Sequence, residues 1–363
     1  MKVLHIITNL QMGGAEKLMT LLLPKLKKLG LDVEILLLDG TKTSIYEELE
    51  NMNIKIHFLG YINNVYHPIN LLKLIRFLGK NKYDIVHTHN TSPQIFAAIA
   101  HLFHRSFKLF TTEHSTSNRR RSIKWMKPLD KWMYKQYDGV ICISDQAEMN
   151  LRNYLGGDFY NIVTIYNGVN VSKIESCASN NNLRGDSNRF IVTMVARMVD
   201  AKDQDTLIRA FSYLPKEEFE LWLVGDGPRR SVLESLVCKL NLAGNVKFWG
   251  VRTDVPVLLK TSDVIVMSSH YEGLSLSNIE GMAAKKPFVA SDVDGIREVT
   301  KGAGILFPHE NDKILSDIII RLKSDESFYN SIASSCLSRA KKYDISIMAD
   351  SYLQFYKKKY SDV

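Results

Sequence analysis

Short apolar runs alternate with helically spaced apolar positions along the whole of this 363-residue chain. In the first half, the runs have the length and the β-branched content of buried strands. They are Val3–Thr8, Val33–Leu38, Ile54–Leu59, Asp84–His87, Lys108–Thr112, Gly139–Ile143 and Ile162–Ile165. Apolar residues at helical spacing separate the first two runs and predict an amphipathic helix. These residues are Ala15, Leu18, Met19, Leu22, Leu23, Leu26 and Leu29.

The second half repeats the alternation. Its predicted strands are Phe190–Val195, Phe219–Val224, Val246–Phe248, Val264–Met267, Phe288–Ser291 and Ile305–Phe307. Apolar strands that alternate with helices are typical of a parallel sheet covered on both faces. The sequence therefore predicts an α/β fold with two Rossmann-like parallel-sheet domains. Because ligands of such sheets bind outside the carboxyl ends of the strands, we expect the two domains to face a central cleft.

A polar segment divides the two halves. Residues 172–188 include SNNNLRGDSN and have no apolar period, which is typical of a loop. We predict an N-terminal domain over residues 1–172, a linker over 173–188 and a C-terminal domain over 189–344. The final segment, from about residue 345 to 363, is amphipathic and contains YKKKY.

Composition narrows the class of protein. The hydrophobic content of 45% and the charged content of 24% are ordinary for a globular protein. The four cysteines have no paired spacing, which argues against a disulfide framework and a cysteine-ligated zinc site. The apolar start is short for a signal peptide, and no run is long enough to span a membrane. We expect a cytoplasmic protein that either is free or lies on a membrane without crossing it.

Two segments could bind an anion. Gly13 and Gly14 follow the first predicted strand and open a helix, whose amides and dipole favour negative charge. In the second half, Arg197 and Lys202 lie between a strand and a helix and could face a diphosphate. The alternatives are a glycine turn without a ligand and two solvated cations. The sequence GDGP, which begins at Gly225, indicates by itself only a tight turn.

Two acids flank a loop in the sequence HYEGLSLSNIE. Glu272 follows a predicted strand, and Glu280 lies in the first turn of the next helix. Ser277 and Glu280 also match a capping box, which would stabilise the helix by about 1 kcal/mol without any ligand. A capping box leaves Glu272 and the exposed loop amides unexplained.

Taken together, these motifs resemble those of retaining GT-B glycosyltransferases of family 4. The resemblance rests on the Glu-x7-Glu pattern in YEGLSLSNIEGMAAKKPFVASDVDGIREV and on GGAEK, YDIVHTHN, FTTEHS, YNGVN, VARMVDAK and VGDGP, which occur in family-like order over nearly the whole chain. It implies the GT-B fold, with the C-terminal helix packed back on the N-terminal domain.

The resemblance also implies roles for individual residues. Glu280 would accept hydrogen bonds from the ribose of a nucleotide-sugar donor, and Glu272 would contact the transferred sugar. His114 would reach the sugar near its reacting carbon. The remaining positions would surround the diphosphate and the donor, with Arg197 and Lys202 offsetting the charge of the leaving group. These positions are Gly13, Gly14, Arg197, Lys202, Gly225, Gly250, Gly273, Leu274 and Ser275.

Two further motifs could suggest a metal. Asp292 and Asp294 form an Asp-x-Asp motif, but they end a strand of a Rossmann-like half, where we do not expect a metal site. His87 and His89 share one strand face, and no third ligand accompanies them. We therefore expect no metal and no cofactor.

The surplus positive charge lies in the first half. Residues 1–172 contain 21 Lys and Arg against 14 Asp and Glu, which gives +7 of the total +8. Residues 119–135 are basic and contain interleaved Trp and Met, a pattern that favours contact with an anionic membrane. The alternative is an ordinary helix with a solvated basic face. No motif of nucleic-acid recognition accompanies the charge, so we expect no nucleic acid partner.

We therefore expect a retaining, metal-independent glycosyltransferase at the inner face of a bacterial cell membrane. Its donor would be a nucleotide-diphosphate sugar, with uridine as the expected nucleoside. Its acceptor would be a saccharide or a lipid-linked saccharide of cell-surface polysaccharide synthesis. Two alternatives remain open. One is a nucleotide-sugar epimerase of the same fold, and the other is a saccharide-binding scaffold without activity.

Overall fold

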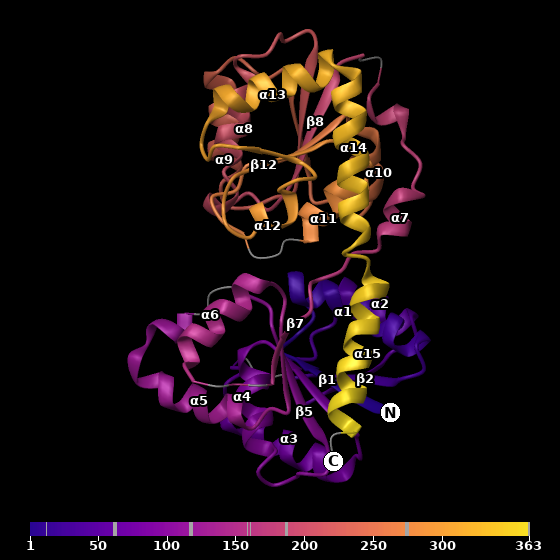
Figure 1. Ribbon diagram of the computed structural model, residues 1–363, viewed down its shortest axis with the longest axis vertical. Coiled ribbons are helices and arrows are strands. Elements are labelled where there is room, and N and C mark those ends of the chain that lie inside the picture. The colour runs from indigo at the N-terminus through magenta and orange to yellow at the C-terminus, as the bar shows by residue number, and fades with distance from the viewer. Residues whose placement is uncertain are drawn as a thin grey trace. The chain divides into compact units, whose positions relative to one another are not determined.

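The computed structural model describes residues 1–11, 13–60, 64–115, 119–157, 159, 161–185, 188–272 and 276–361. The chain divides into two compact units (Figure 1). Unit 1 consists of Met1–Gly168 and Ile345–Val363, and unit 2 consists of Val169–Asp344. Within the described residues, no helix is long and apolar enough to cross a membrane.

Unit 1 is built on a seven-stranded parallel sheet of order β3-β2-β1-β4-β5-β6-β7. Its strands are β1 (Lys2–Ile7), β2 (Asp32–Leu37), β3 (Lys55–Phe58), β4 (Ile85–His89), β5 (Lys108–Glu113), β6 (Gly139–Cys142) and β7 (Ile162–Thr164). Its helices are α1 (Gly14–Lys28), α2 (Ser44–Asn51), α3 (Pro68–Lys80), α4 (Thr91–Ala100), α5 (Lys127–Lys135), α6 (Asp145–Leu155) and α15 (Ile345–Ser361). Two 3-10 helices, η1 (Arg119–Ser122) and η2 (Lys124–Met126), precede α5.

Unit 2 contains a six-stranded parallel sheet of order β10-β9-β8-β11-β12-β13. Its strands are β8 (Phe190–Val195), β9 (Phe219–Val224), β10 (Val246–Gly250), β11 (Val264–Met267), β12 (Phe288–Ser291) and β13 (Ile305–Phe307). Its helices are α7 (Val171–Glu175), α8 (Gln204–Phe211), α9 (Arg230–Lys239), α10 (Val255–Thr261), α11 (Leu276–Ala283), α12 (Arg297–Thr300), α13 (Asp312–Ser324) and α14 (Glu326–Lys341), with 3-10 helices η3 (Asn181–Leu183) and η4 (Asp200–Lys202).

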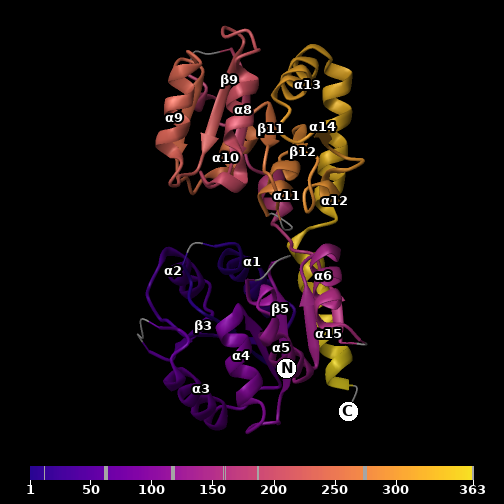
Figure 2. The ribbon, with the colours of Figure 1, turned by 90° about the vertical axis from the view of Figure 1, so that its left-hand side faces the viewer.

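Every predicted strand is confirmed, with ends that differ by at most two residues. The apolar runs succeed as predictors because both sheet faces are covered, so most residues of the inner strands are buried, whereas the edge strands β3 and β10 are more exposed. In unit 2, right-handed crossovers place α8 and α9 on one face and α11 on the other. Helix α13 packs on α8 and α14 on α11, which completes both layers (Figures 1 and 2).

Several helices begin at a side-chain cap. Ser144 Oγ accepts a hydrogen bond from the Ala147 amide at 3.2 Å at the start of α6. Asp325 Oδ1 accepts one from the Phe328 amide at 2.9 Å at the start of α14. These caps satisfy amides that the helix itself leaves without partners.

The last helix belongs to unit 1, although the chain reaches it only after completing unit 2. Helix α15 packs against α1 and the sheet, and its Tyr352 and Tyr356 are fully buried. Tyr352 Oη shares a hydrogen bond with Thr112 Oγ1 at 3.0 Å, and Tyr356 Oη shares one with His87 Nδ1 at 2.5 Å. The C-terminal segment is thus part of the core of unit 1.

Candidate active site

The strand order of unit 2 reverses between β8 and β11. These two strands are neighbours, and the chain leaves their carboxyl ends toward opposite sides of the sheet. Such a switch point opens a crevice where α/β sheets bind their ligands. The loop after β8 carries Arg197 and Lys202, and the loop after β11 carries Glu272. The sheet therefore brings three of the predicted residues to one edge.

Lys202 and Glu272 form an ion pair across this switch point. Lys202 Nζ contacts Glu272 Oε1, and the two side chains are 17% and 9% exposed. Ser269 Oγ donates to the same carboxylate oxygen at 3.0 Å. The His270 amide donates to the Ala201 carbonyl at 2.9 Å and ties the two loops together. A lysine and a glutamate that are largely withdrawn from solvent thus neutralise each other.

Arg197 lies on the same loop, and its side chain is exposed. Gln204 Nε2 donates to the Arg197 carbonyl at 2.9 Å and fixes the backbone there. The turn after β9 packs against this loop so closely that a Cβ on Gly225 would lie 2.1 Å from the Ala196 carbonyl oxygen. Gly225 also has a φ of +130°, which disfavours any other residue. Its amide donates to the Gly250 carbonyl at 2.8 Å, so both predicted glycines support the loop of Arg197.

Glu280 is half-buried in α11. The helix begins at Leu276, so Ser277 lies inside the first turn and is not the N-cap. The capping-box interpretation of Ser277 and Glu280 is therefore wrong. The predicted loop residues Gly273, Leu274 and Ser275 lie outside the described residues.

In unit 1, Gly13 is the N-cap residue of α1, and Gly14 is its first residue. Gly13 has extended backbone and no side chain to cap the helix. The Glu16 carboxylate lies against Gly13, where an added Cβ would be 2.2 Å from Glu16 Oε2. Asn90 Nδ2 donates to Glu16 Oε1 at 3.1 Å. A ligand anion at these amides would lie close to the negative charge of Glu16.

His114 ends a chain of hydrogen-bonded imidazoles. His5 Nδ1 shares a hydrogen bond with His89 Nε2 at 2.9 Å, and His89 Nδ1 shares one with His114 Nε2 at 2.8 Å. The His87 ring stacks on those of His5 and His89. Burial lowers the pKa of His5 to about 3 and that of His114 to about 4. Burial, followed by the charges of the neighbouring imidazoles, also holds the pKa of His87 and His89 well below the usual value. His114 is therefore a neutral imidazole with a fixed orientation.

Sequence reasoning missed His5 and Ser269. His5 is a polar residue within the apolar strand β1, and it is fully buried. A polar residue inside an apolar run was the feature of the sequence that could have identified His5 as a candidate site residue. Ser269 follows β11 directly, at the sheet edge where ligands of this fold bind.

The basic segment is less cationic on its surface than its sequence indicates. Arg120 is buried and pairs with Asp130 at 2.9 Å, and Arg121 pairs with Glu113 at 2.7 Å. Burial of these acids explains why two of the three consecutive arginines point inward. Trp125 is 74% exposed and Leu129 is 47% exposed. Trp125 and Leu129 are therefore more exposed to solvent than Arg120 and Arg121.

The Asp-x-Asp motif of unit 2 is engaged by a cation of the protein. Arg297 Nε pairs with Asp292 Oδ1 at 2.5 Å, and Arg297 Nη1 pairs with Asp294 Oδ1 at 3.0 Å. A metal ion at these acids would have to displace the guanidinium.

Two family profiles match the two halves of the chain. Residues 12–173 match the family described as Glycosyltransferase Family 4, and residues 178–338 match the family described as Glycosyl transferases group 1. The two matches together cover most of the chain.

Individual relatives and solved structures agree with these matches. The UDP-Gal:alpha-D-GlcNAc-diphosphoundecaprenol alpha-1,3-galactosyltransferase of Escherichia coli is 27% identical over 287 residues, 74% of this chain and 73% of the relative. The capsular polysaccharide biosynthesis glycosyltransferase CapH of Staphylococcus aureus is 26% identical over 314 residues, 83% and 84% of the two chains. The crystal structure of Anabaena HepE in complex with UDP has the same fold, with a TM-score of 0.84 at 21% identity over 98% of this chain and 99% of HepE.

Proposed function

Because this chain belongs to glycosyltransferase family 4 and has the GT-B fold, we propose that it transfers a sugar, with retention, from a UDP-sugar to a saccharide acceptor of cell-surface polysaccharide synthesis. The observation that carries the proposal is the Lys202–Glu272 ion pair at the switch point of unit 2. The name of the E. coli relative supports a uridine donor and an acceptor linked to lipid through a diphosphate.

The proposed reaction breaks the bond between the sugar C1 and the diphosphate oxygen. Negative charge then grows on the leaving oxygen, and fixed cations stabilise it most as it develops. Lys202 and Arg197 supply those cations, and the diphosphate competes with Glu272 for Lys202. The acceptor hydroxyl adds to C1 on the face that the diphosphate leaves, and its proton passes to the departing phosphate oxygen.

Glu272, once released from Lys202, can accept hydrogen bonds from the hydroxyls of the sugar. Glu280 is proposed to hold the ribose, and His114 to contact the sugar as a neutral donor or acceptor of a hydrogen bond. Lys202 and Arg197 together carry two positive charges toward a diphosphate, which supports transfer without a metal ion in the chemical step.

Donor binding tests the proposal directly. We expect calorimetric titration of the whole chain to show stronger binding of UDP than of GDP or ADP. Glu280→Ala should weaken UDP binding by roughly 10-fold to 100-fold, because hydrogen bonds to a charged group contribute about 1.5–3 kcal/mol. Glu217→Ala, which replaces an exposed acid of unit 2, is the matched control and should bind UDP like the parent protein.

Other outcomes would favour the alternatives. An epimerised sugar nucleotide, formed from donor without acceptor, would indicate an epimerase. Absence of nucleotide binding would favour a scaffold. A product of inverted anomeric configuration by NMR, or a strict requirement for added Mg²⁺ or Mn²⁺, would contradict retaining, metal-independent transfer.

We further propose that unit 1 contacts an anionic membrane, at the inner face of the cell membrane, through the surface around Trp125 and Leu129. Both apolar side chains are exposed, and Lys135 on α5 is exposed as well. Such a combination inserts apolar groups at the headgroup level while lysines attract anionic lipid. The lipid-linked acceptor proposed above would be reached from such a position.

Vesicle binding tests the membrane proposal. The parent protein should co-sediment with phosphatidylglycerol vesicles more than with phosphatidylcholine vesicles. Substituting Trp125→Ser together with Leu129→Ser should reduce this binding about tenfold or more, because the apolar contribution is lost. Phe103→Ser, at a residue that is 66% exposed elsewhere on unit 1, is the control. Equal binding by the double variant would rule out this surface.

Replacing Arg120 and Arg121 is unsuitable as a test of membrane binding because it would leave Asp130 and Glu113 buried without their partners.

A further inference from the structure

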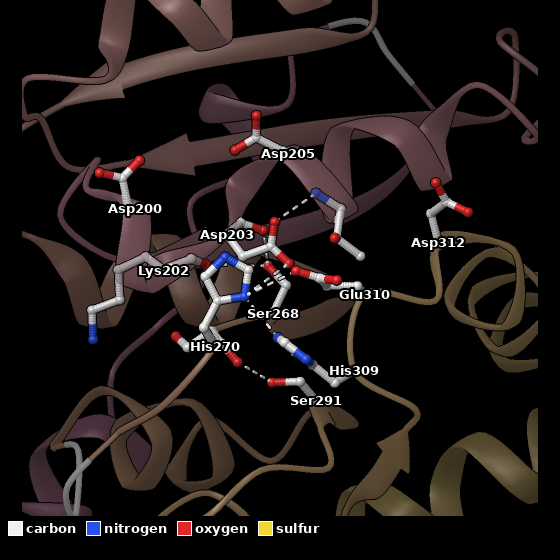
Figure 3. Close-up of polar contacts among 12 residues, drawn as sticks. Asp200, Lys202, Asp203, Asp205, Ser268, His270, Ser291, His309, Glu310 and Asp312 are labelled. Carbon is white, nitrogen blue, oxygen red and sulfur yellow. Dashed lines mark hydrogen bonds and ion pairs between the residues drawn. The ribbon is translucent and has the colours of Figure 1, made fainter.

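A second group of ionisable side chains lies at the carboxyl edge of the unit 2 sheet. Asp203 precedes α8, His270 follows β11, and His309 follows β13. The three ligand atoms that these residues offer lie within 4.8 Å of one another. Figure 3 shows the Asp203 and Glu310 carboxylates and the His309 ring around the ring of His270.

Distances within the group are close to those of a metal coordination shell. His270 Nδ1 lies 2.7 Å from His309 Nε2, 3.9 Å from Asp203 Oδ2 and 3.6 Å from Glu310 Oε1. Tetrahedral Zn²⁺ with bonds of about 2.0 Å separates its ligand atoms by about 3.3 Å. These three distances differ from that separation by roughly 0.3–0.6 Å.

Asp203 supplies an independent sign of a ligand. The residue is only 3% exposed, and its Oδ2 has no hydrogen-bond partner among the described residues. Its other oxygen, Oδ1, accepts a hydrogen bond from the Thr206 amide at 3.1 Å, which fixes the direction of the carboxylate. A buried carboxylate oxygen without a hydrogen bond is costly, and a cation bound there would remove that cost.

The backbone holds the group together, and solvent can reach it. The His270 amide donates to the Ala201 carbonyl at 2.9 Å, so the loops of His270 and Asp203 are joined. His309 and Glu310 are exposed, and Glu310 has a φ of +59°, a conformation that few residues other than glycine adopt. The arrangement thus combines a buried oxygen ligand with imidazole ligands at the surface, and the surface side gives an ion a way in.

We propose that Asp203, His270 and His309 form a Zn²⁺ site, with Glu310 or water as the fourth ligand. Two imidazoles and a carboxylate suit Zn²⁺ better than Mg²⁺ or Ca²⁺, which prefer shells of oxygen atoms. Asp203 is adjacent to Lys202 and His270 is two residues from Glu272, so bound Zn²⁺ would fix the two loops that carry the ion pair. The ion takes no part in the transfer step proposed above, and its binding is measured without any sugar donor.

The test uses the whole chain, stripped of metal with a chelator that is then removed. Calorimetric titration with ZnCl₂ should show one Zn²⁺ per chain with a micromolar or lower Kd. His309→Ala should weaken that binding by about 100-fold or more, since loss even of a residue that only supports a ligand costs 10-fold to 100-fold. His67→Ala, which removes an exposed histidine of unit 1, should bind like the parent protein.

Two further measurements are decisive in either direction. Zn²⁺ should raise the Tm of the parent and of His67→Ala but not that of His309→Ala, because an ion that binds only the folded state stabilises it. Co²⁺ should give the visible absorption of a tetrahedral site in the parent and in His67→Ala but not in His309→Ala. Unchanged Zn²⁺ affinity in His309→Ala, absence of stoichiometric binding, or displacement of Zn²⁺ by equimolar Mg²⁺ would overturn the proposal.

Discussion

Lys202→Ala is expected to lower kcat for sugar transfer by about 100-fold to 1,000-fold. The reason is the loss of a positive charge directed at the leaving diphosphate, a contribution that typically amounts to about 3–4 kcal/mol in the transition state. KM for the donor should change less than kcat, because the charge on the leaving oxygen is largest in the transition state. Steady-state kinetics with a saturating acceptor would measure both constants.

Unit 2 offers a matched control for this variant. Lys247 Nζ pairs with Glu220 Oε1 at 2.8 Å, so Lys247→Ala also leaves a buried glutamate without its lysine. Lys247 lies near the amino end of β10, away from the switch point. Both variants should lose stability, but only Lys202→Ala should lose turnover. If the two variants have similar kcat, Lys202 does not act on the leaving group.

The stacked imidazoles of His5, His87 and His89 are expected to lower the free energy of unfolding by about 4 kcal/mol between pH 7.5 and pH 5.5. His5, His87 and His89 are fully buried, and their folded-state pKa values lie well below the ordinary value of about 6.5. Below pH 6.5 the unfolded chain therefore binds protons that the folded chain does not. The contribution of these neutral imidazoles to the free energy of unfolding is fully present above pH 6.5. It is lost as the pH falls toward about 3, by up to about 1.4 kcal/mol per pH unit for each histidine.

Urea unfolding at pH 7.5, 6.5 and 5.5 would measure this dependence. His5→Gln should reduce the decline by about 1.4 kcal/mol, since one of the stacked imidazoles no longer takes up a proton on unfolding. His67→Gln, at an exposed position, should leave the decline unchanged. Equal stability at pH 7.5 and 5.5 would show that the stacked imidazoles are not held neutral.

The fold was predictable from local pattern, because the inner strands of both sheets are buried on both faces and so read as apolar runs. Lys202 and Glu272 were identified individually as site residues, but their ion pair was not. That contact requires β8 and β11 to be neighbours, and strand order cannot be read from the spacing of apolar residues along one chain. The family resemblance gave roles for single residues, whereas the Lys202–Glu272 contact became visible only in the structure of the sheet.

The hydrogen bonds among the histidines also depend on strand order, so they could not be predicted from sequence spacing either. His87 and His89 were considered together because they share a strand face, whereas the hydrogen-bond partners of His89 are His5, 84 positions earlier, and His114, 25 positions later. The pairing with His5 depends on β1 lying beside β4. Asp203, His270 and His309 come from three different loops, so no spacing rule for metal ligands could have joined them.

The basic segment was misjudged for a related reason. Counting charges over residues 119–135 treats every arginine as exposed. Arg121 instead reaches Glu113, which precedes the counted segment and ends β5. The burial of Glu113 draws Arg121 away from the surface, and this contact is visible only in the structure.

The position of α15 bears on the order in which the chain can fold during synthesis. Tyr352 and Tyr356 complete the interior of unit 1, yet the ribosome adds them only after all of unit 2. Every strand of unit 1 emerges earlier and must wait, with part of its apolar surface uncovered, while the 176 residues of unit 2 are translated. The first-made unit of the nascent chain is therefore the part that needs protection from aggregation, and a stop codon between unit 2 and α15 would damage the unit that was made first.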